Sequence, residues 1–105
     1  MITISKKNIY KGSWWFNNKR KHPSYVIKSN NKNYFVVRTL SHSRDSDNDF
    51  ELYSSPNPKL KNDKQYISSR KYIENSKDPF GKHYKNFKFS YKDNKRFKKW
   101  NKRKK

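Results

Sequence analysis

HPSYVIKSNNKNYFVVRTLS, residues 22–41, carries the clearest structural signal in the chain. Two runs rich in β-branched and aromatic residues, 25–27 and 34–37, flank the polar string 29–33. Asn tolerates positive φ and bonds to its own backbone in turns, so the pattern predicts an antiparallel hairpin with a short loop. We expect this hairpin to lie at the centre of the core.

The apolar pattern also predicts how the two strands pair. A register whose partner numbers sum to 62 places Tyr25 opposite Val37 and Ile27 opposite Phe35. These four side chains then share one face with Thr39, because side chains alternate along a strand. A slip of one residue would bring polar side chains among the apolar partners, so we predict the first register.

We expect the functional site at the open end of this hairpin, next to its second face, with the Lys-rich C-terminus adding affinity. The second face carries Ser24, Val26, Lys28, Tyr34, Val36, Arg38 and Leu40. His22 and His42 extend this face at the open end of the hairpin, about 5–8 Å apart by cross-strand geometry. Imidazoles transfer protons near neutral pH, so the two histidines could cleave RNA through its own 2′-OH while Arg38 holds the phosphate. The alternative is two exposed loop histidines with no catalytic role.

Composition limits the size of the core. Hydrophobic residues make up 30% of the 105 residues, against about 45–50% in ordinary globular domains with Gly included. Aromatic residues reach 17%, and each ring can bury roughly 150–250 Å². We therefore expect most aromatic rings to be core, within a single compact β-rich domain that has charged, flexible ends.

Further elements are expected on both sides of the hairpin. We expect an edge strand within residues 1–8, a turn followed by an aromatic strand or platform within 9–16, a short strand at 50–53, one or two strands at 66–67 and 72–73, and a turn at 78–81. Ser90 followed by Asp93 is typical of a helix start, and a helix from about 91 to 101 would align Phe97 with Trp100. The prediction is a mainly β, half-open barrel of five to six antiparallel strands over residues 1–100, with a short C-terminal helix and a basic disordered tail at 101–105.

Charge points to a polyanionic partner. The net charge is +20; residues 1–44 hold ten Lys or Arg and no carboxylate, and residues 82–105 hold twelve with Asp93 as the one acid. An acidic island at 45–51 is expected to pair with nearby cations or to keep nucleic acid from one rim. It lacks the Gly and Glu of a calcium loop, and the chain has no Cys, so we expect no metal and no cofactor.

No apolar run approaches about 18 residues and no signal-peptide core is present, so we expect a cytoplasmic protein without a membrane partner.

Residues 21–30, KHPSYVIKSN, and residues 34–41, YFVVRTLS, resemble the MazF/PemK-like toxin family over about the first half of the chain. In that family a basic loop and a residue-Pro step lead into an apolar strand, and a second strand ends in Thr or Ser. The resemblance implies an SH3-like barrel and a sequence-specific endoribonuclease, commonly a homodimer that an acidic antitoxin peptide neutralises.

The resemblance also assigns roles to individual residues. His22 stands where the family usually has its catalytic Arg, Thr39 or Ser41 takes the hydroxyl position, and Arg20 is close enough to replace the missing Arg. The string NNKRK at 17–21 replaces a Gly-rich loop. These departures leave an inactive relative as an alternative to an active enzyme.

The sequence thus predicts a small basic nucleic-acid-binding protein, with RNA preferred to DNA as its partner. If it is an enzyme, we expect a metal-independent endoribonuclease. The alternative is a non-enzymatic DNA-associated, ribosome-associated or mobile-element protein, or a basic partner that docks on an acidic protein or a nucleic-acid enzyme. The candidate catalytic residues are His22, Thr39 and His42. The candidate nucleic-acid contacts are Trp14, Trp15, Lys19, Arg20, Lys21, Arg38 and Arg44.

Overall fold

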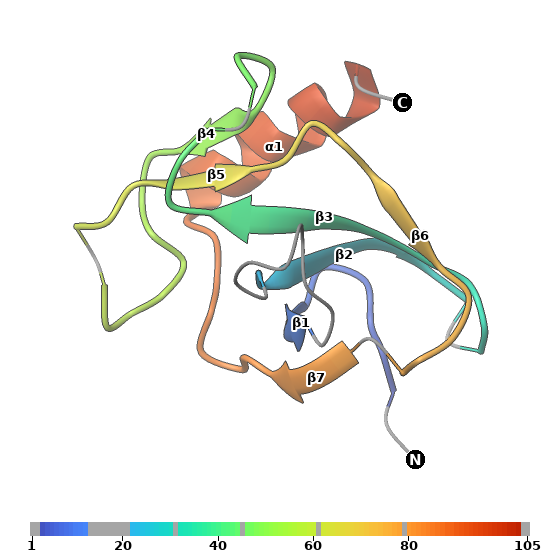
Figure 1. Ribbon diagram of the computed structural model, residues 1–105. Helices are drawn as coiled ribbons and strands as arrows, with labels where there is room; N and C mark the ends of the chain where they lie inside the picture. The colour runs from blue at the N-terminus through green and yellow to red at the C-terminus, as the bar shows by residue number, and fades with distance from the viewer. Residues whose placement is uncertain are drawn as a thin grey trace.

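The computed structural model describes residues 3–12, 22–30, 32–44, 46–60, 62–78 and 80–103, which form seven antiparallel strands and one helix (Figure 1). These are β1 (Ile9–Gly12), β2 (Ser24–Ser29), β3 (Phe35–Ser41), β4 (Phe50–Leu52), β5 (Gln65–Ile67), β6 (Tyr72–Glu74), β7 (Phe80–His83) and α1 (Tyr91–Arg103). The strand order is β4-β5-β3-β2-β1-β7, and β6 pairs with β3. The described sheet is open, so the predicted mainly β, half-open barrel-like fold with a C-terminal helix is confirmed.

The predicted hairpin is the centre of this sheet. β2 pairs with β3, and β3 pairs in addition with β6 through residues 35–37 and with β5 through residues 40–41. The Asn30 side chain closes the loop, because its Oδ1 accepts hydrogen bonds from the backbone amides of residues 32–34 at 2.9, 3.2 and 3.1 Å. The turn chemistry of asparagine therefore acts as the sequence predicts.

The predicted register of the hairpin is wrong by one residue. Tyr25 lies opposite Arg38 and Val26 lies opposite Val37, and a bulge before Lys28 shifts the pairing again near the loop. The prediction assumed that one face of the hairpin is apolar and the other polar. Both faces are buried in the structure, so the alternation of apolar residues cannot choose between the two registers.

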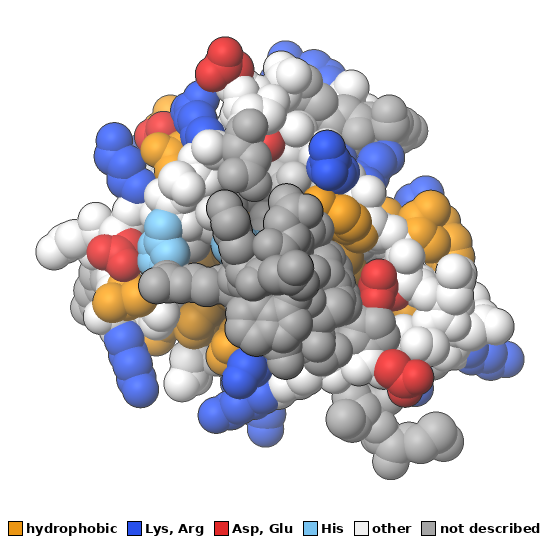
Figure 2. Space-filling model, in the orientation of Figure 1, with side chains coloured by type: hydrophobic (Ala, Val, Ile, Leu, Met, Phe, Trp, Pro, Cys, Tyr) orange, Lys and Arg blue, Asp and Glu red, His pale blue; other side chains and the backbone are white. Residues whose placement is uncertain are grey.

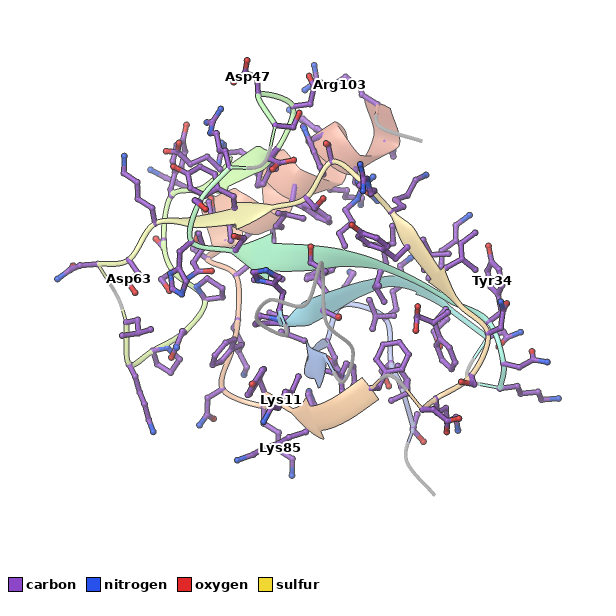
Figure 3. All side chains as sticks on the ribbon, viewed as in Figure 1. Lys11, Tyr34, Asp47, Asp63, Lys85 and Arg103 are labelled. Atoms are coloured by element: carbon purple, nitrogen blue, oxygen red, sulfur yellow. The ribbon has the colours of Figure 1, made fainter. Side chains whose placement is uncertain are left out.

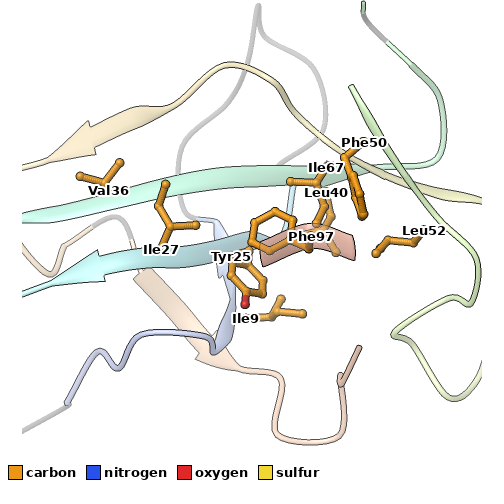
Figure 4. Close-up of a cluster of buried hydrophobic side chains, with 9 residues drawn as sticks. All are labelled: Ile9, Tyr25, Ile27, Val36, Leu40, Phe50, Leu52, Ile67 and Phe97. Atoms are coloured by element: carbon orange, nitrogen blue, oxygen red, sulfur yellow. The ribbon is translucent and has the colours of Figure 1, made fainter. Parts of the chain in front are cut away.

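Alternation along β2 and β3 divides the core between the two faces of the sheet. The larger cluster, drawn in Figure 4, consists of Ile9, Tyr25, Ile27, Val36, Leu40, Phe50, Leu52, Ile67 and Phe97. The smaller one consists of Ile4, Tyr10, Val26, Phe35, Val37 and Phe80. Aromatic rings stand in both clusters, as the composition predicts. Burial raises the pKa of the Tyr25 phenol to about 12, so this ring stays neutral inside the core.

Phe97 attaches α1 to the larger cluster. Its ring centroid lies 5.1 Å from that of Tyr25, 5.7 Å from that of Phe50 and 5.9 Å from that of Phe89. Trp100, one turn later, lies 5.7 Å from Phe97, so the predicted pair on one helix face is confirmed. Figure 1 shows α1 beside β4 and β5, at the end of the molecule away from β7.

The start of α1 agrees with the prediction from the sequence, but its end does not. The helix starts as predicted, with the backbone amide of Asp93 donating to Ser90 Oγ at 3.2 Å. It runs through Arg103, so residues 101–103 of the predicted disordered tail are helical. Lysine and arginine are good helix formers and suit the last turn, where their charge opposes the helix dipole.

The turn predicted at 78–81 lies at 77–80, where the Phe80 amide donates to the Lys77 carbonyl oxygen at 3.1 Å, and β7 follows it directly. It begins at Phe80, whose ring packs against Tyr10 at 5.7 Å and Phe35 at 5.1 Å between centroids. Burial of this ring makes the residues after the turn a strand, which the local sequence does not indicate. Gly81 permits the pairing with β1, because a Cβ there would lie 3.0 Å from the carbonyl oxygen of Lys11. The predicted aromatic platform after Gly12 and the basic loop at 17–21 lie outside the described residues.

We expect Phe97→Ala to lower the free energy of unfolding by about 3–5 kcal/mol, because the ring is lost from the contact between α1 and the sheet. Lys98→Ala, on the exposed side of the same helix turn, should leave it nearly unchanged. Urea unfolding followed by circular dichroism measures both. A Phe97→Ala variant as stable as the wild type would show that α1 does not depend on this core.

Candidate nucleic-acid interface

Arg38, expected to hold a phosphate, is a core residue beneath α1 with 0% of its surface exposed. Its Nε donates to Asn101 Oδ1 at 3.0 Å, and its Nη1 donates to the carbonyl oxygens of Ser68 at 3.1 Å and Ser69 at 2.8 Å. The Trp100 ring centroid lies 4.7 Å from the guanidinium carbon. Burial lowers the pKa of Arg38 to about 10, so it is charged at neutral pH. Arg38 joins the helix to the loop between β5 and β6, where no phosphate reaches it.

Arg44 is exposed but is held by the acidic island. Its Nη2 lies 3.1 Å from Glu51 Oε1, and its guanidinium carbon lies 5.1 Å from the Tyr66 ring centroid. The hydrogen bond to Glu51 raises the pKa of Arg44. The expectation that the acidic island pairs with neighbouring cations is met here, and the same pairing lowers the charge that Arg44 offers to a polyanion.

The two histidines lie at the open end of the hairpin, as expected. His22 is half-buried just before β2 and His42 is exposed just after β3. The two strands are held together there by a hydrogen bond from the Leu40 amide to the Pro23 carbonyl oxygen at 2.9 Å. Thr39, the candidate hydroxyl, is 7% exposed.

His42 has two polar neighbours from another part of the chain. Its Nδ1 lies 3.1 Å from Gln65 Nε2 and 3.7 Å from Asp63 Oδ2. An imidazole beside a carboxylate can be oriented for proton transfer. The five remaining predicted contacts, Trp14, Trp15, Lys19, Arg20 and Lys21, lie outside the described residues.

An open hollow of about 640 Å³ separates the acidic island from α1. Its walls carry both signs of charge: Asp47, Asp49 and Glu51 on the side of the island, and Arg44, Arg96, Lys99 and Arg103 around them. Asp49 is used within the fold, accepting hydrogen bonds from the amides of Ser46 and Ser69 at 3.3 and 2.9 Å. The acidic wall makes the island side of this hollow a poor place for a phosphate, whereas Lys99 and Arg103 on its α1 side are exposed to solvent.

The outer face of α1 carries six exposed cations, of which Lys99 and Arg103 also line the hollow beside the acidic island. We call it the basic face; it comprises Lys92, Lys95, Lys98, Lys99, Lys102 and Arg103, all exposed. At about 100° per residue these six side chains fall within an arc of roughly 140°.

No described helix is long and apolar enough to cross a membrane.

Asp93 fixes the orientation of this face. Its carboxylate is 0% exposed and accepts hydrogen bonds from the amides of Tyr53 at 3.0 Å and Ser54 at 3.1 Å. Arg96 Nη1 donates to the same carboxylate at 2.9 Å and to the Glu51 carbonyl oxygen at 3.1 Å. Because Asp93 and Phe97 both point to the sheet, the lysines on the opposite side of the helix face solvent.

Elsewhere the described cations are spread out. Figure 2 shows described Lys and Arg side chains at several separate places around the margin of the molecule. Figure 3 places Lys11 and Lys85 at the end of the molecule away from Arg103. The sequence contained a signal for the basic face, since Lys and Arg recur around the apolar pair Phe97 and Trp100. The predicted site lies instead at the open end of the hairpin, where His42 follows β3.

Comparison of the chain with protein-family models, with curated proteins and with solved structures yields no significant match.

We expect Arg38→Ala to lower the free energy of unfolding by about 2–4 kcal/mol, because two backbone carbonyls and the Asn101 side chain lose their donor. Arg70→Ala, at an exposed arginine in the same loop between β5 and β6, serves as the matched control and should be nearly neutral. Thermal and urea unfolding provide the measurement. An Arg38→Ala protein of normal stability that binds RNA poorly would restore the phosphate-holding role.

Proposed function

We propose that this protein binds nucleic acid, RNA in preference to DNA, through the basic face of α1. The observation that carries the proposal is the continuous row of six exposed cations on a helix docked by a buried aromatic ring and a buried carboxylate. A surface of this kind attracts the phosphate backbone and releases its counterions on binding. The net charge of +20 adds long-range attraction to any polyanion.

The placement of the basic face supports contact and not only attraction. Exposed lysines three or four residues apart on one side of a helix are separated by about 4.5–6 Å along its axis, so several can contact one nucleic-acid strand at the same time. The helix is held in place by Phe97, Asp93 and Arg38, and the cationic row is therefore rigid at its base. Long lysine side chains above a fixed backbone adapt to the path of a phosphate chain.

Binding of a single-stranded RNA of about 16 nucleotides, measured across salt concentrations, tests the proposal. We expect Lys95→Gln combined with Lys99→Gln to weaken binding and to reduce the slope of log K against log salt by about 1.4, since each phosphate contact on a single strand contributes about 0.7.

The matched control is Lys11→Gln combined with Lys85→Gln, which removes the same charge at the other end of the molecule (Figure 3). The control should lower affinity only slightly. Equal losses in the two double variants would show that the charge acts diffusely, and the basic face would then have no special role.

A second candidate, a metal-independent endoribonuclease that resembles the MazF/PemK-like family, is favoured by one observation at the hairpin. His42 lies beside Gln65 and Asp63 at the end where His22 also lies. In such a reaction one imidazole takes the proton of the 2′-OH, the oxygen attacks phosphorus, and the other imidazole protonates the departing 5′-oxygen. Arg38 is not available to the phosphate, so the cation would have to come from elsewhere.

If this candidate is correct, the wild type cleaves RNA in the presence of EDTA and leaves 2′,3′-cyclic phosphate ends. His42→Ala and His22→Ala should each lower the rate at least about 100-fold, the usual scale of general acid–base catalysis. His83→Ala, in β7, is the control and should retain activity. Intact RNA after prolonged incubation with the wild type would reject the enzyme and leave the binding proposal untouched.

A further inference from the structure

Two exposed tyrosines border the basic face of α1. Tyr91 is 72% exposed and Tyr53 is 67% exposed, the highest values among the large apolar side chains of the described residues. Single exposed apolar side chains are ordinary on protein surfaces. Two aromatic rings beside one cationic surface suit nucleic-acid binding, because aromatic rings stack on bases and cations bind phosphates.

The Tyr53 ring is held in place before any partner arrives. The amide of Tyr53 donates to the buried Asp93 carboxylate at 3.0 Å, which fixes the backbone at the start of α1. The guanidinium carbon of Arg96 lies 3.6 Å from the ring centroid, and Asp93 holds that guanidinium at 2.9 Å. One side of the ring is thus supported by a cation, and the ring loses little conformational freedom on binding.

Tyr91 stands on the other side of the same lysines. It is the first residue of α1, and the Lys95 ammonium one turn later lies 4.9 Å from its ring centroid. With about 100° of rotation per residue, Lys92, Lys95 and Lys99 fall between Tyr91 and Arg96 around the helix. Because Arg96 lies over the Tyr53 ring, these three cations are flanked by one tyrosine on each side.

We infer that the partner is single-stranded nucleic acid, whose unpaired bases stack on Tyr53 and Tyr91 while its phosphates contact the lysines between them. This inference rests on the proposed function and adds the class of nucleic acid. A duplex keeps its bases stacked on one another and offers no free base to either ring. An acidic protein surface could pair with the lysines equally well, but its binding would not depend on the stacking of bases on Tyr53 and Tyr91.

Four variants and two probes test the inference. The probes are one mixed-sequence RNA strand and the same strand annealed to its complement. Tyr53→Ala and Tyr91→Ala should each weaken single-strand binding at least about fivefold, the lower end for loss of one stacked base. Tyr53→Phe and Tyr91→Phe should bind nearly as the wild type does, because they keep the ring. None of the four should change the salt slope, since no phosphate contact is removed.

Tyr34→Ala is the matched control, because Tyr34 is 40% exposed and lies in the hairpin loop, far from α1 in Figure 3. It should bind both probes normally. The wild type should bind the single strand at least about tenfold more tightly than the duplex. Thermal unfolding of each variant confirms that the fold is retained; Tyr91 is exposed on the first helical turn, so its alanine variant is the least disruptive test.

The inference is overturned if both alanine variants bind the single strand as the wild type does, or if the duplex binds as tightly as the single strand. A loss in Tyr34→Ala equal to that in Tyr91→Ala would overturn it as well. These outcomes are separate from a failure of the proposed function, because the salt slope of the lysine variants reports phosphate contact whether or not bases stack.

Discussion

The buried carboxylate of Asp93 is the contact on which the arrangement of the C-terminal half depends. This carboxylate lies on the first turn of α1 and accepts hydrogen bonds from two backbone amides that follow β4. It also pairs with the guanidinium of Arg96. A carboxylate without exposed surface is stable only when its charge is compensated, and here three donors do so. Once this group and Phe97 are placed against the sheet, the rotation of the helix about its axis is determined.

A scarcity of aliphatic side chains explains much of the remaining structure. With hydrophobic residues at 30%, the chain builds two small cores in which aromatic rings supplement the aliphatic side chains, one core on each face of a sheet centred on a single hairpin. α1 closes the larger core and carries its cations outward. Arg38 fits the same pattern, because a buried guanidinium fills space under Trp100 while binding three oxygen atoms. Residues that look like ligands for a phosphate can therefore be part of the core.

Local signals in the sequence predicted local structure well. The Asn30 turn, the strands at 50–52, 65–67 and 72–74, and the Ser90 cap all follow from chemistry within a few residues. The register failed because both faces of the hairpin are apolar: Tyr25 and Ile27 share the α1 side with Val36 and Leu40, while Val26 shares the other side with Phe35 and Val37. β7 was missed because the burial of Phe80 against Tyr10 is visible only after folding.

The candidate site shows the same limit. Charge and composition predicted a polyanion partner, but the choice of residues relied on a hairpin face whose Arg38 proved to be internal and whose Arg44 is paired with Glu51. The basic face could be derived from the sequence only by combining the helix period with knowledge of which helix side is buried. The helix period is known from the sequence alone. Which side of the helix is buried is known only from the contacts of Phe97 and Asp93 in the structure.

Amide chemical shifts recorded during titration with a short RNA strand test most directly where the partner binds. If the basic face is the interface, the largest shifts occur over residues 91–99 and at Tyr53, and they saturate together. If the largest shifts fall instead on residues 22–24 and 39–44 at the open end of the hairpin, with α1 unchanged, binding takes place at the histidines and the assignment to the helix is contradicted.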